Sequence, residues 1–237
     1  MQTQIVDAQK IREADMEEMF NLFDTFYANT DRERFQHDLK EKDWLIRMLD
    51  NGKLVGFSTQ KEVTLRNPVE PQRYLFSGDT IVHPDYWNRS QLAGAFGHLF
   101  SRLLEQDHTP LYWFLISKGF RTYRFLPVFF REFIPHHQQK HPELKTRLDA
   151  VATSMFGALY DATSGRVDFQ GQRDHLRDVL VDIPPGREQD PHVAFFLQAN
   201  PGYACGTELA CICPLSEDNL TGCGKRVIRN TEVAWHV

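Results

Sequence analysis

An almost wholly apolar segment, Leu111–Ser117, constrains the fold of this chain more than any other. It follows Pro110 and reads LYWFLIS, with no charged residue. A strand of this composition is covered on both faces, so it belongs at the centre of a sheet on which helices pack. One such helix precedes it, because the apolar residues of Ser90–Gln106 recur every three or four positions.

The segments before this strand alternate between strand-like and helix-like patterns. The dipeptide Asn51-Gly52 separates two of the strand patterns and favours a hairpin turn. The order predicts an α/β fold with a mixed, mostly antiparallel sheet flanked by helices. The expected strands are Gln4–Ala8, Trp44–Leu49, Leu54–Leu65 and Tyr74–Val82, and the expected helices are Asp15–Tyr27 and Asp31–Lys40.

Beyond the central strand the pattern is less regular, but no shift in composition marks a domain boundary. We therefore expect a single domain over 1–237. Its core comprises about 1–135 and a pair of late strands within 193–215, and a helical insertion occupies about 136–190. The expected segments are a helical stretch Thr122–Phe133 broken near Pro127, a helix Leu144–Tyr160, the strands Val193–Leu197 and Glu208–Leu215, and a loop-rich tail from Ser216.

Composition excludes several classes of protein. The 237 residues include 27 Lys and Arg against 32 Asp and Glu, which gives a net charge of −5, and 41% are hydrophobic. This balance excludes global disorder and argues against nucleic-acid binding driven by charge alone. No apolar run is long enough to span a bilayer, and the N-terminus lacks the apolar core of a signal peptide. We expect a cytoplasmic protein.

The cysteines and the clustered histidines do not follow the spacing of a metal site. The four cysteines all lie in the last fifth of the chain and form no disulfide framework. Cys211 and Cys213 fall on one face of an expected strand, where they act as small buried hydrophobes. His136, His137 and His141 belong to a polar loop for which we expect solvent exposure. No metal is expected.

The most informative segment runs from Tyr74 to Gln106. It comprises a strand, the residues Val82-His83-Pro84-Asp85-Tyr86, a polar loop and an amphipathic helix. A loop at the start of a helix presents free backbone N–H groups and the positive end of the helix dipole, which together bind anions such as a pyrophosphate. The residues of this loop are Trp87, Asn88, Arg89, Ser90, Gln91 and Leu92.

The order of elements, with V-x-P-x-Y at Val82, Pro84 and Tyr86, resembles the GNAT superfamily of N-acetyltransferases. The resemblance implies a V-shaped cleft where the strand before the loop splays from its neighbour. Acetyl-CoA or another acyl-CoA would lie there as donor, with its diphosphate on the loop. A backbone N–H near Ile81 or Val82 would contact the acyl oxygen.

The loop departs from the family pattern R/Q-x-x-G-x-G/A, because Ser90 and Leu92 stand where glycines are usual. Glycine lets the backbone approach a phosphate closely. Relatives of this fold also take acyl groups from an acyl carrier protein or from aminoacyl-tRNA. The basic residues Lys118, Arg121 and Arg124 either contact such a phosphate or form a solvated helix face.

Two residues are candidates for proton transfer. Asp79 follows Gly78 within a strand, where neither residue type is favoured, so it is either a base or part of a β-bulge. Tyr123 is placed by the resemblance as the acid that protonates the leaving thiolate; the alternative is a core tyrosine among its phenylalanine neighbours.

We therefore expect an acyltransferase that moves an acyl group from a thioester to a small-molecule amine. The alternatives are the same reaction with a carrier-protein or tRNA donor in natural-product assembly, and a non-catalytic module that binds a ligand or partner in the cleft. A homodimer is expected by analogy with the fold, and no membrane association is expected.

Overall fold

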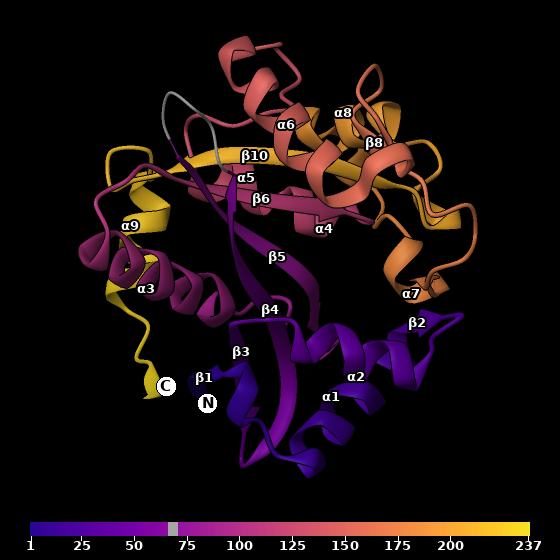
Figure 1. The fold of residues 1–237 in the computed structure, drawn as a ribbon. Coiled ribbons are helices and arrows are strands. Elements are labelled where there is room, and N and C mark those ends of the chain that lie inside the picture. Colours follow the sequence, from indigo (N-terminus) through magenta and orange to yellow (C-terminus); the bar gives the residue numbers. More distant parts are fainter. Residues whose placement is uncertain (66–70) are drawn as a thin grey trace.

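The apolar segment lies near the middle of a nine-stranded sheet in the computed structural model (Figure 1). There β6 (Leu111–Ser117) pairs in parallel with β5 (Gln72–Val82) and antiparallel with β10 (Glu208–Leu215). The structure describes residues 1–65 and 71–237, apart from the side chain of residue 178. Within these ranges, no helix combines the length and the apolar character needed to cross a membrane.

The sheet is mixed and mostly antiparallel, as the sequence predicts. Its order is β11-β1-β3-β4-β5-β6-β10-β8-β7, and only the β1–β11 and β5–β6 pairs among these are parallel. A separate pair joins β2 to β9. The remaining strands are β1 (Gln2–Asp7), β2 (Tyr27–Ala28), β3 (Trp44–Asp50), β4 (Lys53–Leu65), β7 (Tyr160–Asp161), β8 (Arg166–Val167), β9 (His175–Leu176) and β11 (Ala234–His236).

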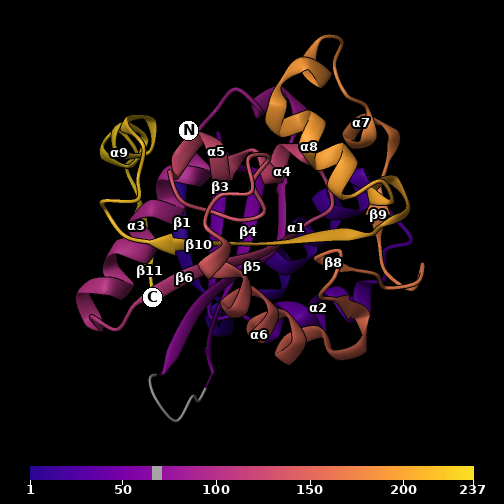
Figure 2. The same cartoon turned by 90° about the horizontal axis from the view of Figure 1, so that it is seen from above.

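Helices cover both faces of this sheet. On one face lie α3 (Gln91–Gln106), α4 (Phe120–Tyr123), α5 (Phe125–Phe129), α8 (Pro191–Ala199) and α9 (Gly222–Arg229). The opposite face is shared by α1 (Glu13–Phe26) and α2 (Arg32–Lys40) over β3 and β4, and by α6 (Lys145–Phe156) over β6 and β10. Figure 2 shows α6 and α8 on opposite sides of β10. The short helix α7 (Asp178–Val181) follows β9.

Alternation along the strands divides the interior into three clusters. In β5, Leu75 packs with α3 while its neighbour Phe76 packs with α6. Beyond the middle of the same strand, Ile81 packs with α1 and α2 instead. Successive side chains of a strand point to opposite faces, and a register shift after Ser77 moves Ile81 to the face opposite Leu75, so one strand serves all three clusters. The three clusters meet beside the second half of β5.

Local sequence signals account for the turns that the sequence predicts. Asn51 and Gly52 both have positive φ, 49° and 81°, which is the geometry of a tight hairpin between β3 and β4. The side chain of Asp31 accepts a hydrogen bond from the Arg34 N–H at 3.0 Å and so begins α2.

A β-bulge in the pairing of β5 with β4 lies close to the point where β5 leaves β6. Gly78 and Asp79 together stand opposite Thr59 of β4, because the register passes from Ser58↔Thr80 to Gln60↔Ser77. A Cβ atom on Gly78 would lie 2.7 Å from Thr59 Oγ1, so glycine fits this position. The β5–β6 ladder ends at Ser77↔Leu115, although β5 continues to Val82. The two strands start side by side and then diverge (Figure 1).

Two predictions for the second half of the chain are wrong. Val193–Leu197 is not a strand but part of α8, because Asp190 caps the helix and Pro191 takes its first position. β10 therefore pairs with β6 and β8 rather than with 193–197. The tail from Ser216 is not loop-rich throughout, since it holds α9 and β11.

The expected helix Thr122–Phe133 is two short helices that meet at Arg124, three residues before Pro127. The insertion is less helical than expected. It contains α6 and α7, but also β7, β8 and β9.

Close packing of α9 on α3 depends on small residues. A Cβ atom on Gly97 would lie 2.2 Å from Ile228 Cγ1, and one on Gly94 would lie 2.0 Å from Thr231 Oγ1. Gly97→Ala should lower the free energy of unfolding by about 1–3 kcal/mol, as overpacked cores do, measured by urea denaturation. Adding Ile228→Ala should recover part of this loss in a double-mutant cycle.

The matched control is Gly222→Ala, where the added Cβ atom meets nothing within 4 Å. Equal losses for the two alanine variants, or strictly additive effects of Gly97→Ala and Ile228→Ala, would contradict the assigned contact.

Candidate active site

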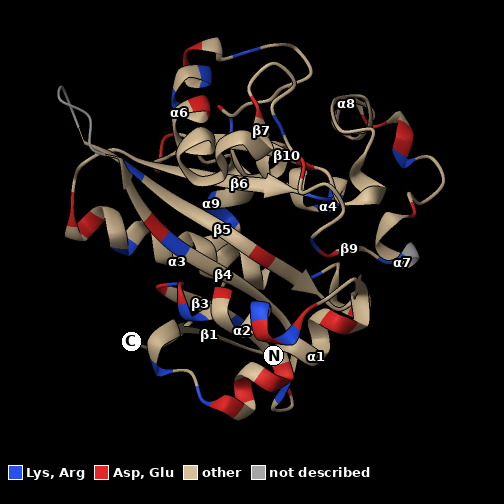
Figure 3. Cartoon of the chain, turned by 45° about the vertical axis from the view of Figure 1, so that its right-hand side comes forward, with Lys and Arg blue, Asp and Glu red and all other residues tan. Residues whose placement is uncertain are grey.

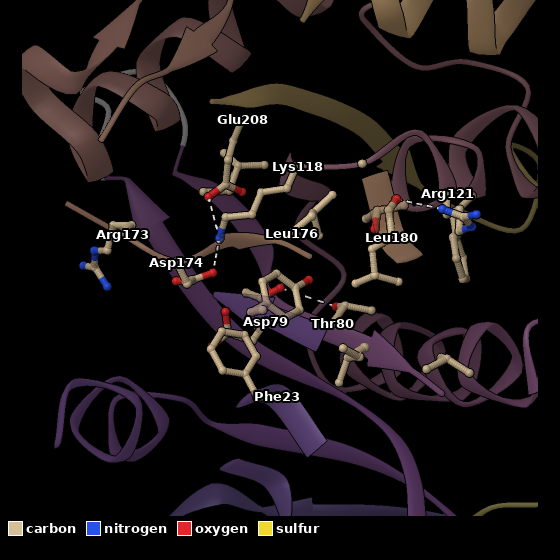
Figure 4. A pocket seen from close by; sticks show the side chains of 18 of the residues that line it. Phe23, Asp79, Thr80, Lys118, Arg121, Arg173, Asp174, Leu176, Leu180 and Glu208 are labelled. Carbon is tan, nitrogen blue, oxygen red and sulfur yellow. Dashed lines mark hydrogen bonds and ion pairs between the residues drawn. The ribbon is translucent and has the colours of Figure 1, made fainter. Parts of the chain in front are cut away.

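A cleft of about 610 Å³ opens where β5 leaves β6. Its walls come from α1, α2, the second half of β5, the start of α3, the β6–α4 turn and the segment 169–187. Figure 4 shows charged and apolar side chains from these elements turned toward one another. The cleft therefore lies where the β5–β6 ladder has ended, next to the bulge of β5 against β4.

A buried lysine lies at the floor of this cleft. The Nζ atom of Lys118 lies 2.7 Å from Asp174 Oδ2 and 3.2 Å from Glu208 Oε1 (Figure 4). The register explains the second contact: Leu209 pairs with Ser117, so Glu208 at the start of β10 stands opposite Lys118 at the end of β6. Asp174 arrives from the insertion, one residue before β9.

The floor carries more negative than positive groups. Asp79 also lines the cleft, and among the described residues its carboxylate makes no hydrogen bond. Three carboxylates thus lie near two ammonium groups, those of Lys118 and Lys42. Residues of both signs are also mixed on α2 and α6 (Figure 3). A cleft lined by an excess of one charge attracts the opposite charge, so this floor suits a cationic group such as an amine.

Burial and charge shift the pKa values of this cluster. Burial raises the pKa of Glu208 to about 7, although the charge of Lys118 opposes the rise. Burial and the nearby Asp174 likewise raise the pKa of Asp79. For Lys118, burial lowers the pKa, but the charges of Glu208 and Asp174 outweigh that effect and raise it overall. Lys118 is thus a fixed cation, and two of its neighbours are carboxyl groups of raised proton affinity.

The segment 171–177 closes the cleft over the floor. Asn29 and Arg34 donate hydrogen bonds to backbone carbonyls of Gly171 and Gln172 at 3.1 Å and 2.7 Å. Arg173 forms an ion pair with Asp38 at 2.9 Å. These contacts, with the β2–β9 pair, hold the segment against α1 and α2. This part of the insertion brings Asp174 to the floor.

The opposite end of the cleft is basic. No side chain caps the N-terminus of α3 within the described chain, so its first backbone N–H groups face outward. The arginines that line this end are Arg89, Arg121, Arg124 and Arg187. Arg121 stacks on the Trp87 ring at 4.0 Å and donates to the Leu180 carbonyl at 2.8 Å. A helix N-terminus beside arginines is an arrangement that binds phosphate.

The structure brings some of the expected loop residues to the cleft and leaves others outside it. Ile81, Val82, Trp87, Arg89 and Leu92 line it. The side chains that do not line it are Asn88, Ser90 and Gln91.

The backbone of β5 distinguishes Val82 from Ile81. The His83 N–H donates to the Val55 carbonyl of β4 at 2.8 Å. Because alternate residues of an antiparallel strand face the same edge, the Ile81 N–H faces β4 and the Val82 N–H faces the diverging edge. The Val82 carbonyl agrees with this orientation, since it accepts a hydrogen bond from the Trp87 indole at 2.9 Å.

Tyr123 does not join Asp79 in the cleft. Its side chain is fully buried among Phe133, Phe195 and Phe196, and its hydroxyl donates to the Pro135 carbonyl at 2.9 Å. The tyrosine that does line the cleft is Tyr27, whose ring lies 5.5 Å from Lys118 Nζ.

The sequence does not indicate Glu208 or Asp174 as site residues, and it places Lys118 either against a phosphate or on a solvated helix face, whereas the structure pairs Lys118 with both carboxylates. The available signals were weak: Lys118 directly follows an apolar central strand, and Glu208 directly precedes another. Their pairing depends on the register between strands ninety residues apart in sequence, which a local pattern does not report. Arg121 and Arg124 do line the basic end, although Arg124 also pairs with Asp190 at 3.2 Å.

No protein-family model matches the sequence, and no curated protein matches it. Several solved structures do match it. They are N-acyltransferases by name. A probable N-acyltransferase of Enterococcus faecalis matches 56% of this chain and 33% of its own length, at 15% identity and a TM-score of 0.43. The chain therefore spans about one third of that protein.

Two further structures have names of the same kind. A ribosomal-protein-alanine N-acetyltransferase of Brucella melitensis matches 48% of this chain and 79% of its own, at 19% identity and a TM-score of 0.36. An aminoglycoside acetyltransferase from an uncultured soil sample, in complex with sisomicin, matches 52% of this chain and 82% of its own, at 15% identity and a TM-score of 0.37. At such low similarity, nothing about the site of this chain rests on them.

The raised pKa of Glu208 predicts a pH-dependent stability. An unfolded glutamate titrates near 4.5 and the folded one near 7, so between these values the folded state binds more protons. Stability from this group is therefore lost as the pH rises through that window. The unfolding free energy of the wild type, relative to Glu208→Gln, should fall between pH 5 and pH 8 in urea titrations.

Glu217→Gln is the matched control, because Glu217 is 84% exposed. If wild type, Glu208→Gln and the control keep constant differences across this range, the assigned shift is wrong.

Proposed function

We propose that this protein transfers an acyl group from a CoA thioester to the amine of a small molecule. The observation that carries the proposal is the division of one cleft into two ends. A free helix N-terminus and arginines lie at one end, and a carboxylate floor lies at the other. A reaction that joins a phosphate-bearing donor to a cationic acceptor needs both ends.

The donor end matches the anionic part of CoA. The N-terminus of α3 and Arg89 would bind the diphosphate. The pantetheine arm would enter between β5 and β6, beyond the end of their ladder at Ser77↔Leu115. The Val82 N–H on the diverging edge of β5 would donate a hydrogen bond to the thioester oxygen as negative charge develops there.

The acceptor end matches an amine. Free amines of this kind have a pKa of about 10.4 and are almost fully protonated at pH 7, so a base assists the attack. Asp79 would take this proton: it lines the cleft, its carboxylate is free of other hydrogen bonds among the described residues, and burial raises its pKa. Asp174 and Glu208, held by Lys118, would attract the cationic acceptor.

Departure of the thiol needs less assistance from the protein than deprotonation of the amine does. A thiol with a pKa near 8.5 leaves readily as the thiolate, so the reaction can proceed without a side-chain acid. Tyr123 is therefore not assigned this role, in keeping with its place in the core.

Asp79→Asn tests the proposed base. The variant should lower kcat for acetyl transfer to a diamine acceptor by roughly 10²–10⁴-fold, with the affinity for acetyl-CoA unchanged. The deficit should shrink above pH 9, because the acceptor then supplies its own neutral amine. A coupled assay of released thiol across pH 6–10 measures both effects.

Asp85→Asn is the matched control, since Asp85 is an exposed carboxylate close by in the chain. A variant Asp79→Asn that keeps wild-type turnover at pH 7 would remove Asp79 from the mechanism.

Arg89→Gln tests the donor end. If Arg89 contacts a phosphate of CoA, its loss should weaken CoA binding by roughly 10–100-fold, as expected for a hydrogen bond to a charged group. The affinity for pantetheine, which has no phosphates, should not change. Calorimetry with the two ligands separates these results, and Arg229→Gln on α9 serves as the control.

Wild-type protein that binds neither CoA nor acetyl-CoA would contradict the donor assignment. Turnover of an acyl carrier protein thioester by such protein would then identify a different donor for the same cleft.

A further inference from the structure

Three histidines from two distant parts of the chain meet on the far side of α4 from the cleft. His136 and His137 follow Pro135, and His192 is the second residue of α8. The ring of His137 lies 4.4 Å from that of His136 and 4.5 Å from that of His192, measured between centroids. One nitrogen of each imidazole lies within 4.8 Å of the other two.

Two ring nitrogens of this cluster lack a hydrogen-bond partner in the described part of the chain. The Nδ1 atoms of His137 and His192 are buried and have no hydrogen-bond partner in the described part of the chain. His136 Nδ1 accepts a hydrogen bond from the Gln138 N–H at 3.0 Å, so Nε2 is the nitrogen that remains for another contact. A buried polar atom without a partner costs free energy, and two such atoms at one point indicate a missing ligand.

The ligand atoms at this point are imidazole nitrogens. The Asp190 carboxylate is engaged elsewhere, by the backbone N–H of His192 and by Arg124. The ring of Phe133 lies 4.9 Å from that of His136, and the Tyr123 ring also borders His192. Converging imidazoles in a partly apolar wall present lone pairs, which a transition-metal ion accepts.

We propose that His136, His137 and His192 bind a divalent transition-metal ion of the zinc class. Three imidazoles with a fourth position open to water are the ligand set of zinc sites that keep one coordination position free. The ion would join the segment after Ile134, which bridges to Ile212 of β10, to the start of α8. Because Tyr123 and α4 separate this point from the cleft, the site would stabilise the fold and take no direct part in acyl transfer.

The test uses the full chain without a histidine tag. Wild-type protein, stripped with chelator, incubated with Zn²⁺ and then desalted, should retain one zinc per chain by elemental mass spectrometry. His137→Gln and His192→Gln should each weaken zinc binding by at least the roughly 10–100-fold that changes around metal ligands cost. His37→Gln, an exposed histidine on α2, should bind as the wild type does.

Two further readouts separate a metal site from a merely structural histidine cluster. Co²⁺ should give the intense visible absorption of a tetrahedral nitrogen site in the wild type and not in His137→Gln. Free Zn²⁺ at 100 times its Kd should shift the folding equilibrium of the wild type by about 100-fold, and that of either variant far less. Circular dichroism confirms that the variants are folded before metal is added.

Three results would overturn the proposal. They are the absence of stoichiometric zinc in the wild type, unchanged zinc affinity in folded His137→Gln and His192→Gln, and a Co²⁺ spectrum with thiolate charge transfer, which would assign the metal to a cysteine. None of these outcomes depends on acyl transfer, so the test stands apart from that of the cleft.

Discussion

The divergence of β5 from β6 depends on a chain of buried hydrogen bonds at the point where their ladder ends. The Trp113 indole donates to Ser77 Oγ at 2.8 Å, and Ser77 donates to Gln60 Oε1 at 2.7 Å. Gln60 Nε2 then donates to Ser58 Oγ, which bonds Thr80 Oγ1 at 2.6 Å. These side chains belong to three neighbouring strands, β6, β5 and β4. They tie the strands together on either side of the bulge at Gly78 and Asp79. A buried polar chain of this kind is costly to break, because a group left without its partner stays out of contact with water, and the chain therefore holds the three strands in register where β5 and β6 part.

The charge distribution of the cleft follows from this geometry. Lys118 ends the strand that diverges, and Glu208 begins its antiparallel neighbour, so the register alone sets the two side chains opposite each other. Two buried charges in contact are stable only when each is compensated. Lys118 meets that condition through both Glu208 and Asp174. Under the proposed function, the same cluster would also attract a cationic acceptor.

The sequence predicts the first half of the fold well and the site only in part. Helix and strand periodicity, the Asn51-Gly52 turn and the Asp31 cap are local signals, and the structure has each of them. The poor strand propensity of Gly78 and Asp79 predicts either a β-bulge or a catalytic base, and the structure contains the bulge. The sequence-based predictions are wrong or incomplete where contacts between distant segments determine the local structure. The apolar sequence of α8 is typical of a strand, and only the Asp190 cap indicates a helix. The need for glycine at 94 and 97 cannot be predicted locally, because it arises from the packing of the distant α9. No local pattern reports that Asp174 meets Lys118, or that His192 meets His137.

The two ends of the cleft come from different parts of the chain, and this division has a physical consequence. The strand–loop–helix unit from β5 to α3 builds the phosphate end from local sequence, since a helix N-terminus needs only its own backbone. The carboxylate floor requires β10 and the segment 171–177, which α1 and α2 hold in place through Asn29, Arg34 and the Arg173–Asp38 pair. The insertion also reaches the donor end, through Arg187 and through the Leu180 carbonyl that holds Arg121. Under the proposed function, Asp174 is the residue through which the insertion would act on the acceptor.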